Sequence, residues 1–156
     1  MMSRVKQGII AGLIATATVS VIEAINLFLL KLVVPFPEVI ARMVGLPGNI
    51  LAGWALHFVI GALIMGPAFA WLYPKLPTNT PITRGILFAV ACWLGLLVFI
   101  SMSGNLAILA GSKGFDIFAF MLFTHMIFGG VMGSVFARLL AREKLAHSMI
   151  DGAPAH

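Results

Sequence analysis

The sequence Gly53-Trp54-Ala55-Leu56-His57-Phe58-Val59-Ile60-Gly61 places a histidine inside a long apolar run, with glycine four residues before it and four residues after it. In an α-helix these three positions share one face, so we expect the imidazole to lie in a groove with little side-chain bulk above or below it. A similar stretch, His125-Met126-Ile127-Phe128-Gly129, occurs near the end of the chain. The pattern indicates a helical membrane protein built around a repeated histidine.

Composition restricts the class of protein further. Of the 156 residues, 61% are hydrophobic and 10% are charged, and the mean hydropathy is +1.08. A water-soluble domain of this size could not bury so much apolar surface, and a typical soluble protein has about 25% charged residues. The net charge of +5 does not predict nucleic-acid binding, because the basic residues are spread near the ends of apolar segments, as topology-determining charges are. A single cysteine, Cys92, excludes a disulfide framework and a paired-cysteine metal motif.

Four apolar segments are long enough to cross a hydrocarbon layer of ~30 Å, which requires about 20 residues in a helix. They cover residues 7–33, 49–73, 83–103 and 115–140. Proline and glycine residues separate them, and Pro67 inside the second is expected to kink it. The basic start of the chain resembles a signal peptide, but the apolar run behind it continues to about Val34. We therefore interpret it as an uncleaved first span.

The distribution of basic residues predicts the orientation. Seven fall on one side of the four spans, namely Arg4, Lys6, Lys75, Arg84, Arg138, Arg142 and Lys144. The other side has Lys31, Arg42 and Lys113, partly offset by Glu38 and Asp116. The positive-inside rule therefore places both termini in the cytoplasm. Short interfacial helices are expected at residues 38–44 and 106–110 on the outer side. Residues 1–140 form one transmembrane domain in this interpretation, and residues 141–156 form a short, exposed cytoplasmic tail.

An internal repeat relates the two halves of the chain. Residues 6–10 resemble residues 83–87, and His57-x-x-x-Gly61 followed by Met65-Gly66 resembles His125-x-x-x-Gly129 followed by Met132-Gly133, with one residue slipped. The simplest explanation is a duplicated helical hairpin, two spans plus two spans in the same orientation.

Small and polar residues inside a membrane mark the packed faces of helices. In the first span one such stripe comprises Gly8, Gly12, Thr16, Ser20, Glu23 and Asn26. Glu23, His57 and His125 each lie about ten residues from the outer end of their span. At 1.5 Å per residue this is ~15 Å deep, near the middle of the bilayer. An ionised carboxylate there is costly, so we expect Glu23 to meet a histidine, Asn26 or a ligand, or to stay protonated.

Four interpretations of this layer of Glu23, His57 and His125 remain open. The side chains can hydrogen-bond to one another and determine the register of the bundle. Alternatively, His57 and His125 can be the axial ligands of a b-type haem, with Gly61 and Gly129 leaving room for the macrocycle. The layer can also be a proton or ion path. Finally, His57, His125 and Glu23 can ligate a non-haem metal.

Three stretches together resemble a family of small four-span bacterial membrane proteins of unknown function: residues 6–12, residues 53–58 and residues 125–129. The resemblance extends to about Leu140. It implies four helices and a location in the bacterial inner membrane, and it provides no activity and no catalytic residues.

The sequence therefore predicts an all-α, four-helix transmembrane bundle with the bilayer as its surroundings. No nucleophile–base pair or phosphate-binding loop is recognisable, so the chain alone is not expected to be an enzyme. We expect an accessory or anchoring subunit of a larger inner-membrane assembly of a redox or respiratory kind. It would be in contact with other membrane subunits or with further copies of itself. A bis-histidine haem b electron carrier and a small proton, ion or metal transporter are the alternatives.

Overall fold

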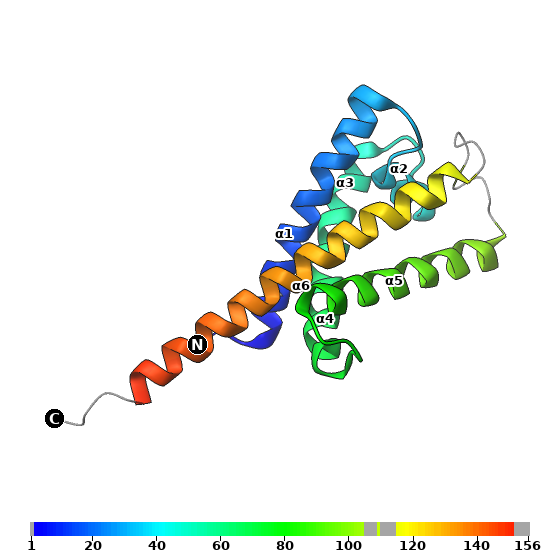
Figure 1. Ribbon diagram of the computed structural model, residues 1–156. Coiled ribbons are helices and arrows are strands. Elements are labelled where there is room, and N and C mark those ends of the chain that lie inside the picture. Colours follow the sequence, from blue (N-terminus) through cyan, green and yellow to red (C-terminus); the bar gives the residue numbers. More distant parts are fainter. Residues whose placement is uncertain (1, 105–108, 110–114, 152–156) are drawn as a thin grey trace.

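The computed structural model describes residues 2–104, 109 and 115–151, and the secondary structure within these ranges is helical (Figure 1). Four helical stretches are long and apolar enough to cross a membrane: Arg4–Leu30, Ile50–Lys75, Pro81–Ser103 and Asp116–Met149. They confirm the all-α class and coincide with the four predicted segments, with limits that differ by up to three residues except at the end of the fourth, which lies nine residues further on.

The first span consists of α1 (Arg4–Ile25) and a π-helical turn, η1 (Asn26–Leu30). The Ser3 side chain caps α1 by accepting a hydrogen bond from the Lys6 backbone N–H, a common N-terminal signal. The span ends at Lys31, whose φ of 51° is left-handed. A short helix, α2 (Phe36–Met43), follows and confirms the helix predicted at residues 38–44. Of the helix predicted at residues 106–110, all but Leu109 lies outside the described residues.

The second span changes helix type three times. It comprises α3 (Ile50–Phe58), the π-helical η2 (Val59–Met65), α4 (Gly66–Leu72) and a short 3₁₀ turn, η3 (Tyr73–Lys75). Near Pro67, where a kink was expected, the helix instead contains a π segment that ends at Met65, two residues before the proline. There the Gly66 N–H donates to the Gly61 carbonyl, five residues back. Proline at the next position has no N–H to donate and is tolerated because it stands in the first turn of α4.

The third and fourth spans are unbroken α-helices. In α5 (Pro81–Ser103), Thr80 and Thr83 form a capping box, and Gly104 ends the helix in a left-handed conformation. The last helix, α6 (Asp116–Asp151), continues well beyond residue 140. The exposed tail expected from residue 141 is thus helical as far as Asp151, because residues 141–149 contain no proline or glycine and several good helix formers. The Gln7 side chain donates to the Glu143 carboxylate and ties this extension to α1.

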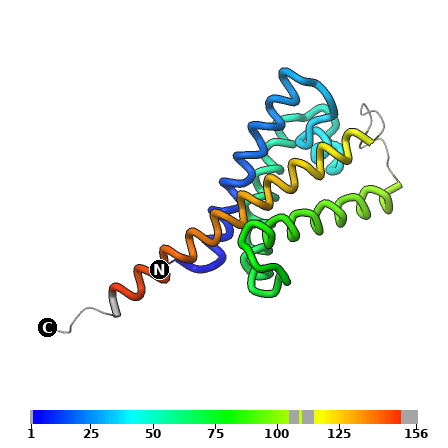
Figure 2. Tube along the Cα trace, in the orientation of Figure 1, coloured from blue at the N-terminus to red at the C-terminus, as the bar shows by residue number. Residues whose placement is uncertain are grey.

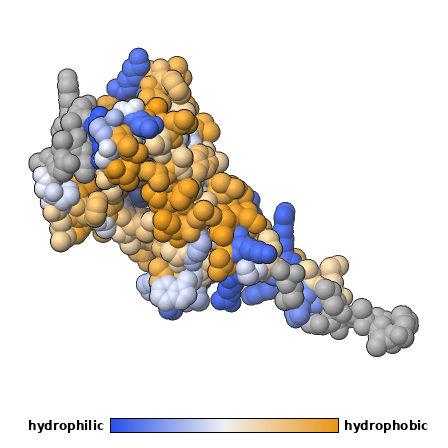
Figure 3. Space-filling model, turned by 180° about the vertical axis from the view of Figure 1, so that it is seen from behind, coloured by the Kyte–Doolittle hydropathy of each residue, from blue (hydrophilic) through white to orange (hydrophobic). Residues whose placement is uncertain are grey.

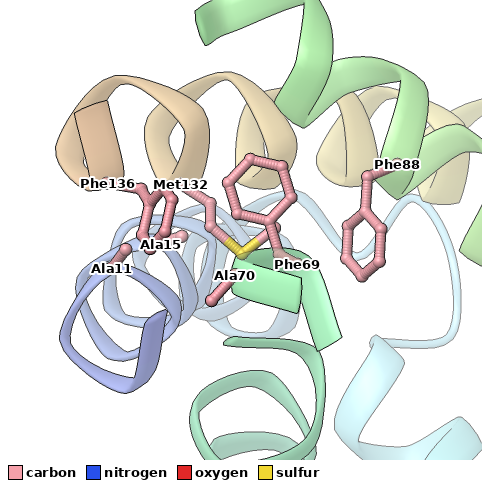
Figure 4. Close-up of a cluster of buried hydrophobic side chains, with 7 residues drawn as sticks. All are labelled: Ala11, Ala15, Phe69, Ala70, Phe88, Met132 and Phe136. Atoms are coloured by element: carbon pink, nitrogen blue, oxygen red, sulfur yellow. The ribbon is translucent and has the colours of Figure 1, made fainter. Parts of the chain in front are cut away.

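The four spans form two hairpins that meet at one end and diverge at the other (Figures 1 and 2). Helix α1 packs against the second span and against α6, whereas α5 packs extensively only against α6. The start of α1 lies near the end where the hairpins meet, and α6 projects beyond that end (Figure 1). At that end α1, α4, α5 and α6 contribute to a buried cluster (Figure 4) of Ala11, Ala15, Phe69, Ala70, Phe88, Met132 and Phe136. The face of the bundle in Figure 3 is mainly apolar, as contact with lipid chains requires.

Glycines bring the helices into contact within each hairpin, and they do so at matching positions of the repeat. A Cβ atom added to Gly8 would collide with the Gly66 carbonyl, and one added to Gly85 would collide with the Gly129 carbonyl and lie 3.0 Å from the Gly133 nitrogen. Since Gly8 corresponds to Gly85 and Gly66 to Gly133, the packing supports a duplicated hairpin. The predicted stripe on α1 is confirmed as a packed face, because all its members except the half-buried Ser20 are buried.

The π segment explains the slipped residue in the repeat. Five positions separate Gly61 from Gly66 in the second span, whereas four separate Gly129 from Gly133 in α6. A π turn inserts one residue into a helix without ending it. Consequently η2 absorbs the additional residue, and both Gly61 and Gly66 still face α1, where a Cβ atom on either would collide with it.

The Gly85→Ala variant tests the glycine contacts. We expect it to destabilise the protein by about 1–3 kcal/mol, because the new methyl group must separate α5 from α6. The matched control is Gly95→Ala on the same helix, where a Cβ atom meets nothing within 4 Å; it should leave stability unchanged or raise it by up to about 1 kcal/mol. Unfolding midpoints in mixed detergent–denaturant titrations provide the measurement. Equal midpoints for the two variants would contradict the packing described.

Candidate functional site

A cavity of about 400 Å³ lies between the four spans and α2. The residues that line it come from all five elements. The polar groups among them are Glu23, His57, Cys92, Thr124 and His125, and the apolar ones include Phe36, Ile40, Met65, Leu96, Phe99 and Phe128. The cavity therefore brings together the three residues that the sequence predicted to form one layer.

The cavity exists because the two hairpins diverge. Helix α2 lies between them at their separated end (Figure 1), while α5 has extensive packing only with α6. On the α5 side the wall is open: Phe99 is 54% exposed, Gly95 is exposed, and a Cβ atom on Gly95 would meet nothing within 4 Å. If the four spans cross a bilayer, this opening faces lipid chains.

The two histidines contact the same aromatic ring. Phe36, the first residue of α2, has its ring centroid 5.6 Å from that of His57 and 5.6 Å from that of His125, with edge-to-face geometry in both pairs. Such geometry is the favoured one for aromatic pairs. Phe36 was not identified from the sequence, because a loop phenylalanine between two prolines gives no local indication of a distant contact.

The hydrogen-bond partners of the two imidazoles differ. His125 Nδ1 lies 2.7 Å from the Met121 carbonyl oxygen. Since a carbonyl can only accept, this nitrogen carries the proton, and Nε2 remains for a ligand. His57 is 7% exposed, and its Nδ1 atom is buried without a partner among the described residues. A buried polar atom without a partner is uncommon and requires an explanation.

The Thr124 hydroxyl adds a further polar group to the wall. Thr124 is buried, and its hydroxyl donates to the Met121 carbonyl at 3.0 Å. It precedes His125 in the chain, and its position in a span next to a histidine was the signal that could have identified it.

Glu23 and Asn26 hold the loop that leads into α2. The Glu23 carboxylate, 1% exposed, accepts the Phe36 backbone N–H at 3.1 Å. The Asn26 side chain donates to the Val33 carbonyl and accepts the Leu32 N–H. These bonds satisfy backbone groups that would otherwise be unpaired inside the bundle. The hydrogen bond that Glu23 makes is thus to Phe36 and not to a histidine or to Asn26, and Phe36 in turn contacts both imidazole rings.

The structure bears on the predicted metal site, whereas the predicted haem site stays a prediction. Among the described residues, no three histidine, cysteine, aspartate or glutamate side chains form a group that could hold a metal ion, so Glu23, His57 and His125 do not form the expected ligand set. His57, His125 and Gly61 line the cavity, and both glycines of the predicted haem site also take part in helix packing. A Cβ atom on Gly61 would collide with the Thr16 hydroxyl, and one on Gly129 would collide with the Gly85 carbonyl, because these glycines serve helix packing.

The role of Glu23 can be tested by comparing Glu23→Leu with Glu23→Gln. Leucine removes the acceptor of the Phe36 N–H, and an unpaired buried donor costs about 1–3 kcal/mol. We expect hydrogen exchange of the Phe36 amide to be about tenfold faster or more in Glu23→Leu, and to change little in Glu23→Gln, whose side-chain oxygen still accepts. Unchanged exchange in the leucine variant would show that the carboxylate does not hold α2.

Comparison with known proteins identifies a family. Residues 2–147 match the model of the family of unknown function DUF6789. Neither the curated proteins nor the solved structures include a match. Because the family model covers nearly the whole helical region, including both histidine stretches, the chain belongs to the DUF6789 family of proteins of unknown function.

Proposed function

We propose that this protein is a membrane-embedded binding protein that takes one lipophilic molecule with a polar head group from the bilayer into the cavity between its spans. The observation that carries the proposal is a largely apolar cavity whose lining includes two histidines, one of which, His125, has Nδ1 bonded to the Met121 carbonyl and Nε2 left for a ligand. A ligand that donates to this nitrogen would pair a polar atom that lies in apolar surroundings.

The size and the lining of the cavity support this function. Ligand sites for small molecules typically have volumes of about 300–1,000 Å³, with apolar walls and a few polar groups that orient the ligand. A volume of about 400 Å³ with five polar residues among eighteen lining residues fits that description. The exposed Gly95 and Phe99 on the α5 side provide a route from the lipid phase that does not require the ligand to cross water.

The binding role is compatible with the accessory subunit expected from the sequence. A chain with no recognisable catalytic group can bind a lipophilic molecule and present it to the other subunits of an assembly in the bacterial inner membrane. The other subunits would then carry out the chemistry. The transport alternative stays a prediction, in which the Glu23 carboxylate, an acceptor of the Phe36 amide, would serve as a relay group.

The Gly95→Trp variant tests the binding function. Gly95 is exposed at the cavity opening, so tryptophan has space there and should obstruct the opening without disturbing the fold, whereas Gly95→Ala should not obstruct it. Native mass spectrometry of protein extracted in native membrane discs should show a bound small molecule in the unmodified protein and in Gly95→Ala, and at least about tenfold less of it in Gly95→Trp. Absence of any bound molecule, or equal retention in both variants, would refute the function proposed.

A bis-histidine haem b protein is the second candidate. The bond from His125 Nδ1 to a backbone carbonyl favours it, because ligating histidines usually donate their other ring nitrogen in this way. The packing at Gly61 and Gly129 counts against it. An optical spectrum of protein purified from haem-supplemented cells decides between the two candidates. A Soret band that is lost in both His57→Ala and His125→Ala would establish haem ligation, and a spectrum without one would exclude it.

A further inference from the structure

We infer that the cavity selects a ligand whose head group is a hydroxyl, such as a phenol or a hydroquinone carrying a hydrocarbon chain, over the corresponding ether or ketone. The inference rests on the proposed binding function and specifies the chemical class of its ligand. The preference for a hydroxyl is inferred from the hydrogen-bonding atoms on the cavity wall that have no partner in the part of the chain that the structure describes.

The wall supplied by α6 presents acceptors. The Met121 carbonyl takes the proton of His125 Nδ1 at 2.7 Å and the hydroxyl proton of Thr124 at 3.0 Å. With these protons used, the neutral His125 ring retains a lone pair on Nε2, and the Thr124 oxygen retains its lone pairs. A ligand that meets this wall must therefore donate a hydrogen bond.

The wall supplied by α3 adds a group that a hydroxyl can also satisfy. His57 lines the cavity, and its neutral ring has one nitrogen that donates and one that accepts. A hydroxyl donates once and accepts as well, so a single head group can donate to one histidine and accept from the other. A ketone or an ether only accepts and would leave His125 Nε2 and the Thr124 oxygen without a donor.

The rest of the cavity favours a neutral ring. Phe36, Phe99 and Phe128 contribute aromatic rings to its lining, and aromatic rings pack well against one another in edge-to-face or offset geometry. An ammonium head group would also donate, but moving a charge into an apolar cavity is costly unless it is fully paired. A phenolic hydroxyl satisfies the acceptors without that cost.

The experiment compares matched probes on the intact protein in lipid nanodiscs. The probes are para-octylphenol, its methyl ether, para-octylacetophenone and octylammonium, and binding is measured by competition in native mass spectrometry. We expect the phenol to bind roughly tenfold more tightly than the ether and the ketone, as one additional buried hydrogen bond predicts. Octylammonium should bind more weakly than the phenol.

Two variants and a matched control attribute this preference to the wall of α6. His125→Phe keeps an aromatic ring without Nε2, and Thr124→Val removes the hydroxyl. We expect the ratio of the affinity for the phenol to that for the ether to fall to about one in His125→Phe and to decrease severalfold in Thr124→Val. Thr18→Val is the control, because the exposed Thr18 hydroxyl likewise donates to a helix carbonyl, that of Ile14, on the lipid-facing side of α1. It should retain the full preference.

The outcomes separate the two proposals. Equal binding of phenol, ether and ketone, or tighter binding of octylammonium, would overturn the hydroxyl selectivity and leave the binding function standing. A preference that survives in His125→Phe would also overturn it. If no probe binds and no molecule is retained from native membranes, both the selectivity and the binding function are wrong.

Discussion

The structure depends on the close approach of helix backbones at glycine residues. Between apolar helices in a bilayer there is no hydrophobic driving force, because lipid chains are as apolar as the side chains, and association relies on close packing and hydrogen bonds. Gly8 against Gly66 and Gly85 against Gly129 provide that packing, one contact in each hairpin. The buried cluster around Phe69 and Met132 (Figure 4) fills the space where the two hairpins meet.

The cavity follows from the way these contacts are distributed. Close glycine contacts join α1 to the second span and α5 to α6; α5 meets the other elements through side chains such as Phe88 and Ile100, without a comparable approach of the backbones. The hairpins can therefore separate at one end, where α2 lies between them (Figure 2). Helix α2 is held there by the bonds from Glu23 to the Phe36 amide and from Asn26 to the preceding loop. Backbone groups at membrane depth must be paired within the protein, so these two polar residues are necessary for the loop to lie where it does.

Much of the fold could be predicted from the residues alone, because the bilayer imposes strong requirements on composition. The four apolar runs and the prolines between them indicated four spans. The similarity of the stretches around Gly8 and Gly85, and of those around His57 and His125, indicated a duplication. The type of each helix and the residue at which it ends were harder to predict from the sequence. The π segment at Val59–Met65 has no local sequence pattern, since it is the response of one helix to an additional residue between two glycines that both must face α1. The continuation of α6 beyond residue 140 was missed because the polar composition there resembles that of a tail.

The candidate site shows how far prediction from the sequence can go. The sequence determined that Glu23, His57 and His125 are polar residues at similar depth in three spans, since depth follows from counting residues along a helix. Only the tertiary structure decided which atoms of those residues are engaged and which are unused. Glu23 bonds to the Phe36 amide, His125 Nδ1 bonds to the Met121 carbonyl, and His57 Nδ1 has no partner among the described residues. The physical reason is that depth fixes only one of the three coordinates of a side chain, whereas a hydrogen bond requires all three coordinates to be right. The other two coordinates depend on the rotation of each helix and on the loop that brings Phe36 between distant segments of the chain.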